Sequence, residues 1–225
     1  ITVDMGDMGK ITFAGLGGSG PVEGTDDVMP TANEESWATV AGTVSGLADG
    51  SEGNNNFTYT LPTLVEGLAL KVFHQPADAA QGSSEEYSAV YTGIENLTIG
   101  YAGGDNEDSL TNTIENTIMY AKYTMDSFTF GIQANEEDEE TASADTDFTA
   151  WGISYAVNDE LSISLGMSET EHENTSLVDQ EAEAISFSYV SGGMTIGGSM
   201  HNVDAVGGTS TTDNSGYELN VTFAF

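Results

Sequence analysis

Carboxylates dominate one long segment of the sequence, between Leu16 and Asn54. This segment holds seven Asp and Glu residues and no Lys or Arg. Four of the carboxylates flank Met29-Pro30 in its middle: Asp26, Asp27, Glu34 and Glu35. Grouped carboxylates attract cations and raise their local concentration, so we expect these four to act on nearby ions. Each of them can also be an ordinary solvated loop residue, and the sequence leaves both readings open.

Other candidate chemistry is weaker. Residues 15–20 match the G-x-G-x-x-G pattern, but Pro21 and several acids follow where a phosphate-binding helix would have to begin. No combination of nucleophile, base and orienting residue is found, so we expect no enzyme. Asp105, Glu107 and Asp108 could offer oxygens to calcium. No EF-hand spacing is present, and a solvated loop is the more ordinary reading of this group.

Composition narrows the function further. The 225 residues include 37 Asp and Glu, 3 Lys and Arg and no Cys, which gives a formal net charge of -34. The absence of Cys excludes a disulfide scaffold and a thiolate metal site. Because phosphate binding needs Lys and Arg, nucleic acid is not an expected partner. No apolar run approaches the roughly 20 residues of a membrane helix.

The elements that must position these residues are β-strands. Short runs of alternating apolar and polar residues recur along the chain, and no segment keeps a helical period over three turns. Thirteen strands are expected, at residues 1–5, 8–15, 55–61, 67–75, 85–92, 96–103, 115–125, 127–134, 146–157, 160–169, 181–190, 193–203 and 214–225.

The connections between these strands alternate between tight and long. The expected long ones are 16–54, 76–84, 104–114, 135–145, 170–180 and 204–213, and they carry most of the acid. This rhythm is typical of an up-and-down antiparallel sheet that crosses a membrane, with short turns at one side and long loops at the other. A soluble sandwich with Greek-key connections lacks this polarity.

Side-chain alternation separates two faces of the strands. In 160–169, an apolar set that includes Ile163 and Leu165 alternates with a small, polar set that includes Ser164 and Gly166. The small set cannot fill a packed core but can line a water-filled lumen, with the apolar set toward lipid. A sheet with its apolar face on a soluble core stays the alternative.

The three lysines all fall on the polar side of this alternation. Lys10 alternates with Ile11 and Phe13, and Lys71 and Lys122 likewise stand between apolar or aromatic neighbours. A lysine toward lipid near the membrane centre would cost about 2–4 kcal/mol, so the lumen is the expected place for all three. The alternative for each is an ordinary lumen residue that pairs with a nearby acid.

The sequence ends in a further alternating strand. From Tyr217 to Phe225 every second residue is apolar, and the intervening residues are polar or small. A soluble protein rarely ends on an exposed aromatic edge strand, because such an edge promotes aggregation. A strand with lipid on one side and water on the other has this pattern by necessity.

At this point the sequence resembles the general, trimeric bacterial porin family. The similar stretches are the hairpin Gly53-Asn-Asn-Asn-Phe-Thr-Tyr-Thr-Leu-Pro-Thr-Leu-Val-Glu-Gly67 with the following Leu68-Ala-Leu-Lys-Val-Phe, the strand Gly9-Lys-Ile-Thr-Phe-Ala-Gly15, and the last strand ending in Phe225. The scarcity of Arg and the abundance of acid resemble porins of marine alphaproteobacteria.

The resemblance implies an all-β fold, a transmembrane antiparallel up-and-down β-barrel of sixteen strands with a long inward loop after the fifth. Here the segment 16–54 follows the second expected strand. We therefore expect residues 1–225 to form a single barrel domain that lacks three N-terminal strands, with 16–54 as the inward constriction loop.

It also implies an outer-membrane porin of a Gram-negative bacterium, a homotrimer in outer-membrane lipid that passes small hydrophilic solutes and ions and prefers cations. The expected constriction is formed by loop acids and wall lysines, namely Asp26, Asp27, Glu34, Glu35, Lys10, Lys71 and Lys122. Tyr217, Phe223 and Phe225 correspond to the family's assembly signal. No cofactor is expected, apart from calcium. The alternative function is an acidic, calcium-binding surface β-protein or adhesin.

Overall fold

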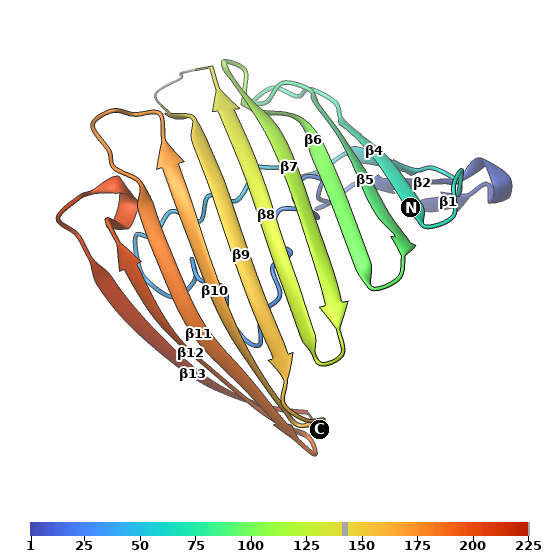
Figure 1. The fold of residues 1–225 in the computed structure, drawn as a ribbon. Helices are drawn as coiled ribbons and strands as arrows, with labels where there is room; N and C mark the ends of the chain where they lie inside the picture. Colours follow the sequence, from blue (N-terminus) through green and yellow to red (C-terminus); the bar gives the residue numbers. More distant parts are fainter. Residues whose placement is uncertain (141–143, 225) are drawn as a thin grey trace. The chain divides into compact units, whose positions relative to one another are not determined.

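The structure is a computed structural model that describes residues 1–140 and 144–224, apart from the side chain of Asp108. The described residues form thirteen strands in chain order (Figure 1): β1 (Thr2–Asp4), β2 (Lys10–Ala14), β3 (Asn56–Thr60), β4 (Leu68–Gln75), β5 (Ser84–Ile94), β6 (Leu97–Ser109), β7 (Asn112–Met125), β8 (Phe128–Glu139), β9 (Thr146–Ala156), β10 (Leu161–His172), β11 (Gln180–Ser191), β12 (Met194–Asp204) and β13 (Asn214–Phe223). Two short 3-10 helices, η1 (Gly6–Met8) and η3 (Val206–Gly208), lie between strands.

Each strand has its neighbours in sequence as its neighbours in the sheet, from β1 through to β13. The pairings from β1 to β6 and from β10 to β13 are antiparallel; in β10 and β11, for example, Ser164 is opposite Ser186. The all-β, up-and-down architecture expected from the alternation is therefore confirmed. No helix in the described part of the chain is long and apolar enough to cross a membrane.

One expected long connection is wrong. β6 continues to Ser109 and β7 already begins at Asn112, so the connection predicted at 104–114 shrinks to Leu110-Thr111. The apolar alternation fades here because the polar Asn106 occupies a covered position where an apolar residue was expected. Similarly, β8 continues to Glu139, and part of the connection predicted at 135–145 lies in 141–143, outside the described residues.

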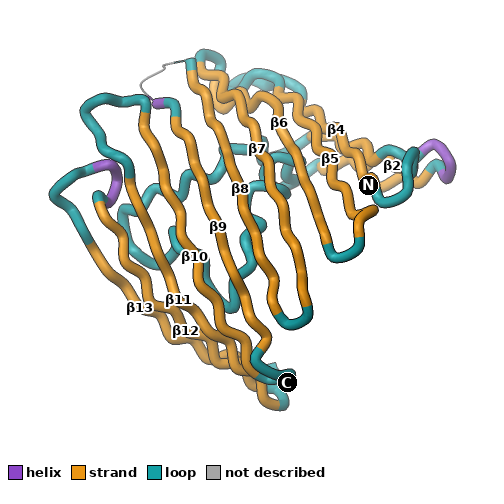
Figure 2. Tube along the Cα trace, viewed as in Figure 1, coloured by secondary structure: helices purple, strands orange, loops and turns teal. Residues whose placement is uncertain are grey.

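The chain divides into two compact units, and each is described by itself. Unit 1 comprises Ile1–Val28, Leu47–Ala121 and Ala134–Thr146, and unit 2 comprises Met29–Gly46, Lys122–Gln133 and Asp147–Phe225. The predicted loop 16–54 contributes to both units. It has no helix or strand of its own beyond an isolated bridge, and it is drawn as loop in Figure 2.

In unit 1 the loop covers one face of the central strands. Val22 and Ala48 from the loop pack with Ala102 of β6 and Ile118 of β7, and all four are buried. These strand residues share their face with polar residues such as Asn116, so the small apolar contact is surrounded by hydrogen-bonding groups. The loop is thereby held on the face that the sequence predicted to be polar.

In unit 2 the same arrangement recurs with other residues. Val40 of the loop packs with Ala182 of β11, Val203 of β12 and Val206 of η3. Trp37 meets Phe148 of β9 edge to face, with ring centroids 5.2 Å apart. Loop segment 29–46 thus has its own small core with the strands of this unit.

The opposite face of the strands is apolar and exposed. On β10 the exposed fractions are 43% for Ile163, 49% for Leu165 and 39% for Met167, whereas Ser164 and Ser168 are buried. The two faces expected from the alternation in 160–169 are confirmed on this strand. A soluble protein would bury the larger set, so this face requires an apolar environment.

Candidate functional site

The two arms of the loop meet at a neck in unit 1, formed by residues 18–20 and 51–53. Ser19 and Glu52 form an antiparallel bridge. The Gly20 N–H donates to the Ser51 carbonyl oxygen at 2.8 Å, and the Gly53 N–H donates to the Gly18 oxygen at 2.9 Å. The loop therefore leaves and returns along one antiparallel ladder, which brings residues more than thirty positions apart side by side.

Five carboxylates of unit 1 gather around this neck, and we call them the neck acids: Glu23, Asp26, Asp27, Asp49 and Glu52. Their charges act on one another. Burial raises the pKa of Glu23, and the nearby Glu52 and Asp49 raise it further. Two of the four loop acids favoured by the sequence, Asp26 and Asp27, thus belong to a larger group that also includes acids from the returning arm.

Asp26 is the most perturbed of the neck acids. It is only 5% exposed, and burial raises its pKa to about 7, with further contributions from Glu23 and Asp27. Burial also raises the pKa of Asp27, although its side chain is more exposed. A carboxyl with a pKa near 7 changes its charge in the physiological range, so the charge of this cluster depends on pH.

Two of the three lysines stand in one row across the sheet of unit 1. Lys10 is opposite Thr60, and Thr60 is opposite Lys71. The row continues through Ser88 to Ala102, which packs under the loop. Paired residues of antiparallel strands share a face, so both lysines lie on the loop-covered, polar face, about 10 Å apart by strand spacing.

Both of these lysines are exposed, and neither forms an ion pair within the described part of the chain. Lys122 of β7 belongs to unit 2 and is half-buried. On β7 it lies on the same face of the strand as Ile118 and Tyr120, which are both buried. The expectation that the three lysines avoid the apolar face therefore agrees with their positions.

The other two favoured acids, Glu34 and Glu35, belong to unit 2. Both are half-buried, and the Thr31 hydroxyl donates to the Glu34 backbone oxygen at 2.8 Å. Serines of the strands fix this segment: Ser164 Oγ accepts from the Ala32 N–H at 2.9 Å, and Ser186 Oγ accepts from the Asn33 N–H at 3.2 Å. The small serines of the polar face thus serve as attachment points for the loop.

Gln180 of β11 fixes the later part of the same segment. Its side chain accepts from the Val44 N–H at 3.0 Å and donates to the Val44 oxygen at 2.8 Å. It also accepts from the Gly207 N–H at 3.0 Å. One buried amide therefore holds both segment 29–46 and the turn η3 in unit 2.

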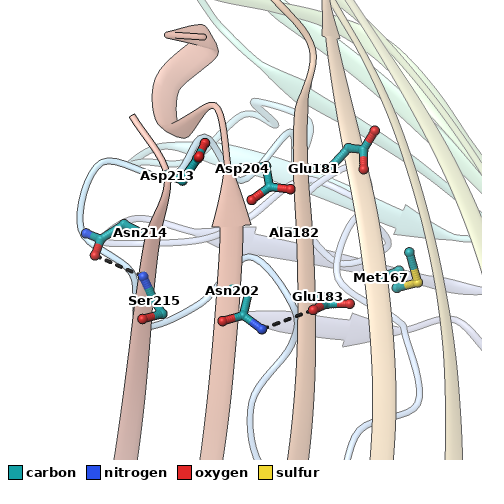
Figure 3. Close-up of a pocket in the computed structure, with 9 residues that line it drawn as sticks. All are labelled: Met167, Glu181, Ala182, Glu183, Asn202, Asp204, Asp213, Asn214 and Ser215. Carbon is teal, nitrogen blue, oxygen red and sulfur yellow. Dashed lines mark hydrogen bonds between the residues drawn. The ribbon is translucent and has the colours of Figure 1, made fainter. Parts of the chain in front are cut away.

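A separate acidic hollow lies on the other face of unit 2, at β11, β12 and β13 (Figure 3). Its volume is about 570 Å³, and its lining includes Glu181, Glu183, Asn202, Asp204 and Asp213. The Asn202 amide donates to Glu183 at 3.0 Å. The next row of paired residues on the same face is apolar: Ile185 is opposite Met200, and Met200 is opposite Tyr217. The hollow therefore marks where this face changes from apolar to acidic.

The remaining predicted site residues are only partly placed. Tyr217 and Phe223 lie on β13 and are 85% and 56% exposed, while Phe225 lies outside the described residues. Asp105 and Glu107 lie on β6, and the Asp108 side chain is not described. Among the described side chains no cluster of three or more His, Asp or Glu could hold a metal ion. The assembly signal and calcium binding stay predictions.

Sequence reasoning missed the contribution of the returning arm. Asp49 and Glu52 were visible as acids, but their approach to Glu23 depends on the antiparallel neck. Gly50 was the available signal, because a Cβ at this position would lie 2.6 Å from the backbone nitrogen of Glu23 on the other arm, and such a close approach favours a residue without a side chain.

Comparison with known sequences now decides the family. A sequence profile described as Gram-negative porin matches residues 1–158 and, in a second overlapping match, residues 77–225. The chain belongs to the Gram-negative porin family. No curated protein sequence matches the chain.

Solved porin structures share the fold. OmpT of Vibrio cholerae matches with a TM-score of 0.71 and 14% identity over 97% of this chain and 77% of its own. An anion-selective porin from Comamonas acidovorans matches with a TM-score of 0.72 and 13% identity, over 98% and 75%. OmpF of Salmonella typhi, solved with daunomycin, gives 0.71 and 15%, over 96% and 74%.

This porin is thus an outer-membrane channel of a Gram-negative bacterium, with transmembrane β-strands of an up-and-down barrel fold. Its family and fold are those of a channel rather than an enzyme. The exposed apolar face is explained by contact with outer-membrane lipid, and the polar, loop-covered face by contact with water. The predicted absence of three N-terminal strands stays a prediction.

Proposed function

We propose that this porin is a passive diffusion channel for small hydrophilic solutes and ions, that it prefers cations, and that loop 16–54 borders its narrow part. The observation that carries the proposal is the group of neck acids. Among these five carboxylates, Asp49 and Glu52 raise the pKa of Glu23, and Glu23 and Asp27 raise that of Asp26. Acidic side chains that line a pore favour cations and oppose anions.

The lysine row modifies this preference. Lys10 and Lys71 lie on the same polar face as the strand residues under the loop, and both are exposed. Opposite charges on a wall and a loop produce a field across a pore, which orients polar solutes as they pass. With 37 acids against 3 basic residues in the whole chain, the balance favours cations.

The relatives do not decide the selectivity. One structural relative is described as an anion-selective porin, at only 13% identity. The preference of this chain therefore follows from its own charges. The loop segment 16–54 carries no Lys or Arg that could reverse the sign of the local potential.

The test is the reversal potential of the reconstituted porin in a planar lipid bilayer across a KCl gradient. The sign of the reversal potential is expected to correspond to preferred potassium flux. In a separate liposome-swelling assay, small neutral sugars are expected to enter. A sign that corresponds to preferred chloride flux would overturn the cation preference. Failure of sugars to enter would overturn the general diffusion role.

We also propose a homotrimer. A structural relative, OmpT of Vibrio cholerae, is described in a trimer form, and this chain carries an extensive exposed apolar face that can meet either lipid or another copy. Native mass spectrometry of detergent-purified protein is expected to give three copies per particle. A monomer in mild detergents and in lipid nanodiscs would contradict the proposal.

A further inference from the structure

Glu86 is a carboxylate buried beneath the loop neck. It lies on β5, opposite Phe73 of β4 and Gly104 of β6, and is only 3% exposed. The preceding residue, Glu85, lies on the other face of the strand and is exposed. Burial of a carboxylate is costly unless its oxygens receive hydrogen bonds, so the partners of Glu86 explain why it is tolerated.

Both partners of Glu86 come from the loop, one from each arm. Its Oε2 accepts from the Val22 N–H at 2.8 Å, and its Oε1 accepts from the Ser51 N–H at 2.5 Å. No Lys or Arg of the described part of the chain pairs with this carboxylate. A single strand residue therefore holds the outgoing and the returning arm through two backbone groups.

Gly20 makes room for this arrangement. A Cβ at position 20 would overlap the Glu86 carboxylate, whereas a Cβ at Gly24 would meet nothing closer than 3.8 Å. The Gly20 N–H in turn donates to the Ser51 oxygen at 2.8 Å. The close approach of the neck to the strand thus depends on a glycine at 20 but not at 24.

Side-chain amides of the neighbouring strands β6 and β7 bond the returning arm, whereas the outgoing arm meets these strands through the packed side chain of Val22. The Asn106 and Asn116 amides both donate to the Asp49 backbone oxygen, at 3.1 and 3.0 Å. Ser51 Oγ donates to Asn106 Oδ1 at 3.4 Å. Loss of these amides would remove hydrogen bonds from one arm only, whereas loss of Glu86 would remove a hydrogen bond from each arm.

We propose that Glu86 is the positioning residue that fixes both arms of the loop to the channel wall in unit 1, and thereby holds the neck acids at a constant place. This inference rests on the proposed role of the loop as the border of the narrow part. A carboxylate suits the task because it accepts two hydrogen bonds and donates none, and hydrogen bonds to a charged acceptor are stronger than neutral ones.

The first test is Glu86→Gln, with Glu85→Gln as the matched control. Glutamine keeps the shape but has one acceptor oxygen, so one of the two loop N–H groups loses its partner. Hydrogen exchange of the Val22 or Ser51 amide is expected to become about tenfold faster or more. The control, one residue away on the other face, should leave both amides unchanged.

A second pair of variants reaches the same contact from the loop. Gly20→Ala places a methyl group against the carboxylate and is expected to speed up the same exchange, whereas Gly24→Ala should not. Because the chain contains no Cys, a spin label at Gly24→Cys reports the loop alone. Its mobility is expected to rise when Glu86→Gln is added and to stay constant when Glu85→Gln is added.

The functional readout is single-channel current at fixed voltage. Glu86→Gln is expected to show added flicker and a smaller reversal potential than the wild type, while Glu85→Gln retains steady current. Unchanged exchange, label mobility and flicker in Glu86→Gln would overturn the inference. If Glu86→Gln changes the exchange and the flicker but the wild-type channel shows no cation preference, the proposed selectivity fails and the positioning role of Glu86 stands.

Discussion

Glu85 and Glu86 are consecutive residues of β5 that face opposite sides of the sheet. Glu85 Oε1 lies 2.8 Å from His74 Nδ1 on the exposed face, whereas Glu86 is buried beneath the loop neck with two backbone N–H groups. The same alternation organises the porin as a whole. One face meets lipid, and the other holds the loop that carries the neck acids.

The charge of Asp26 should make the selectivity depend on pH. Burial, with Glu23 and Asp27 adding to it, raises the pKa of Asp26 to about 7, so the carboxyl gains its charge as pH rises through neutrality. Reversal potentials measured at constant salt should therefore show a stronger cation preference at pH 8 than at pH 6. Asp26→Asn should reduce this difference in reversal potential between pH 6 and pH 8. Glu66→Gln, in an exposed turn, should leave the difference unchanged.

The same carboxyl links pH to stability. Because the folded pKa of Asp26 lies above its ordinary value of 3.8, the folded state binds the proton more tightly than the unfolded state. Stability due to this group is complete below pH 3.8 and falls as pH rises toward 7. Urea unfolding in lipid should thus show Asp26→Asn to be more stable than the wild type at pH 8. An equal or lower stability there would contradict the burial argument.

Lys71 should oppose cations in the wild-type channel. Replacement by Glu removes a positive charge from the exposed row with Lys10 and adds a negative one. The cation-to-anion permeability ratio is expected to rise roughly twofold or more, with Lys71→Gln intermediate, because the local potential becomes more negative. Identical ratios for the wild type, Lys71→Gln and Lys71→Glu would exclude this lysine from the ion path.

Leu219 and Ser215 of β13 should respond very differently to a positive charge. Both are exposed on the same face, but Leu219 lies in the apolar rows opposite Gly198, and Ser215 lies in the acidic hollow opposite Asn202. Leu219→Lys is expected to lower the unfolding free energy in lipid by about 2–4 kcal/mol, and Ser215→Lys by about 0–1 kcal/mol. Equal losses would contradict the assignment of this face to lipid.

The sequence predicted the strands well because alternation is a local property. All thirteen expected strands are present, and the boundaries of 67–75 and 146–157 are within a residue or two of β4 and β9. The prediction failed where the alternation became polar, at 104–114. There, the polar Asn106 continues β6 because the loop covers it and receives its hydrogen bond. The local sequence pattern cannot predict that a distant segment covers a strand.

The candidate site was predictable only in part. The acidity of loop 16–54 is evident from its composition. The face of the sheet on which Lys10 and Lys71 lie follows from the alternation of apolar and polar residues. The role of Glu86 could not be predicted, because its partners Val22 and Ser51 are 64 and 35 positions away. Contacts of this kind depend on how the loop folds back onto the strands. The hydrophobic period of the sequence and the secondary-structure propensities of its residues do not determine this.

We expect the neck acids to set the channel's preference for cations. The most direct measurement is the reversal potential of the wild type and of a triple variant, Glu23→Gln, Asp26→Asn and Asp27→Asn, in the same KCl gradient at pH 8. The wild type is expected to be potassium-selective, and the reversal potential of the triple variant is expected to shift markedly toward zero. A wild type without cation preference, or a triple variant with the wild-type potential, would contradict this expectation.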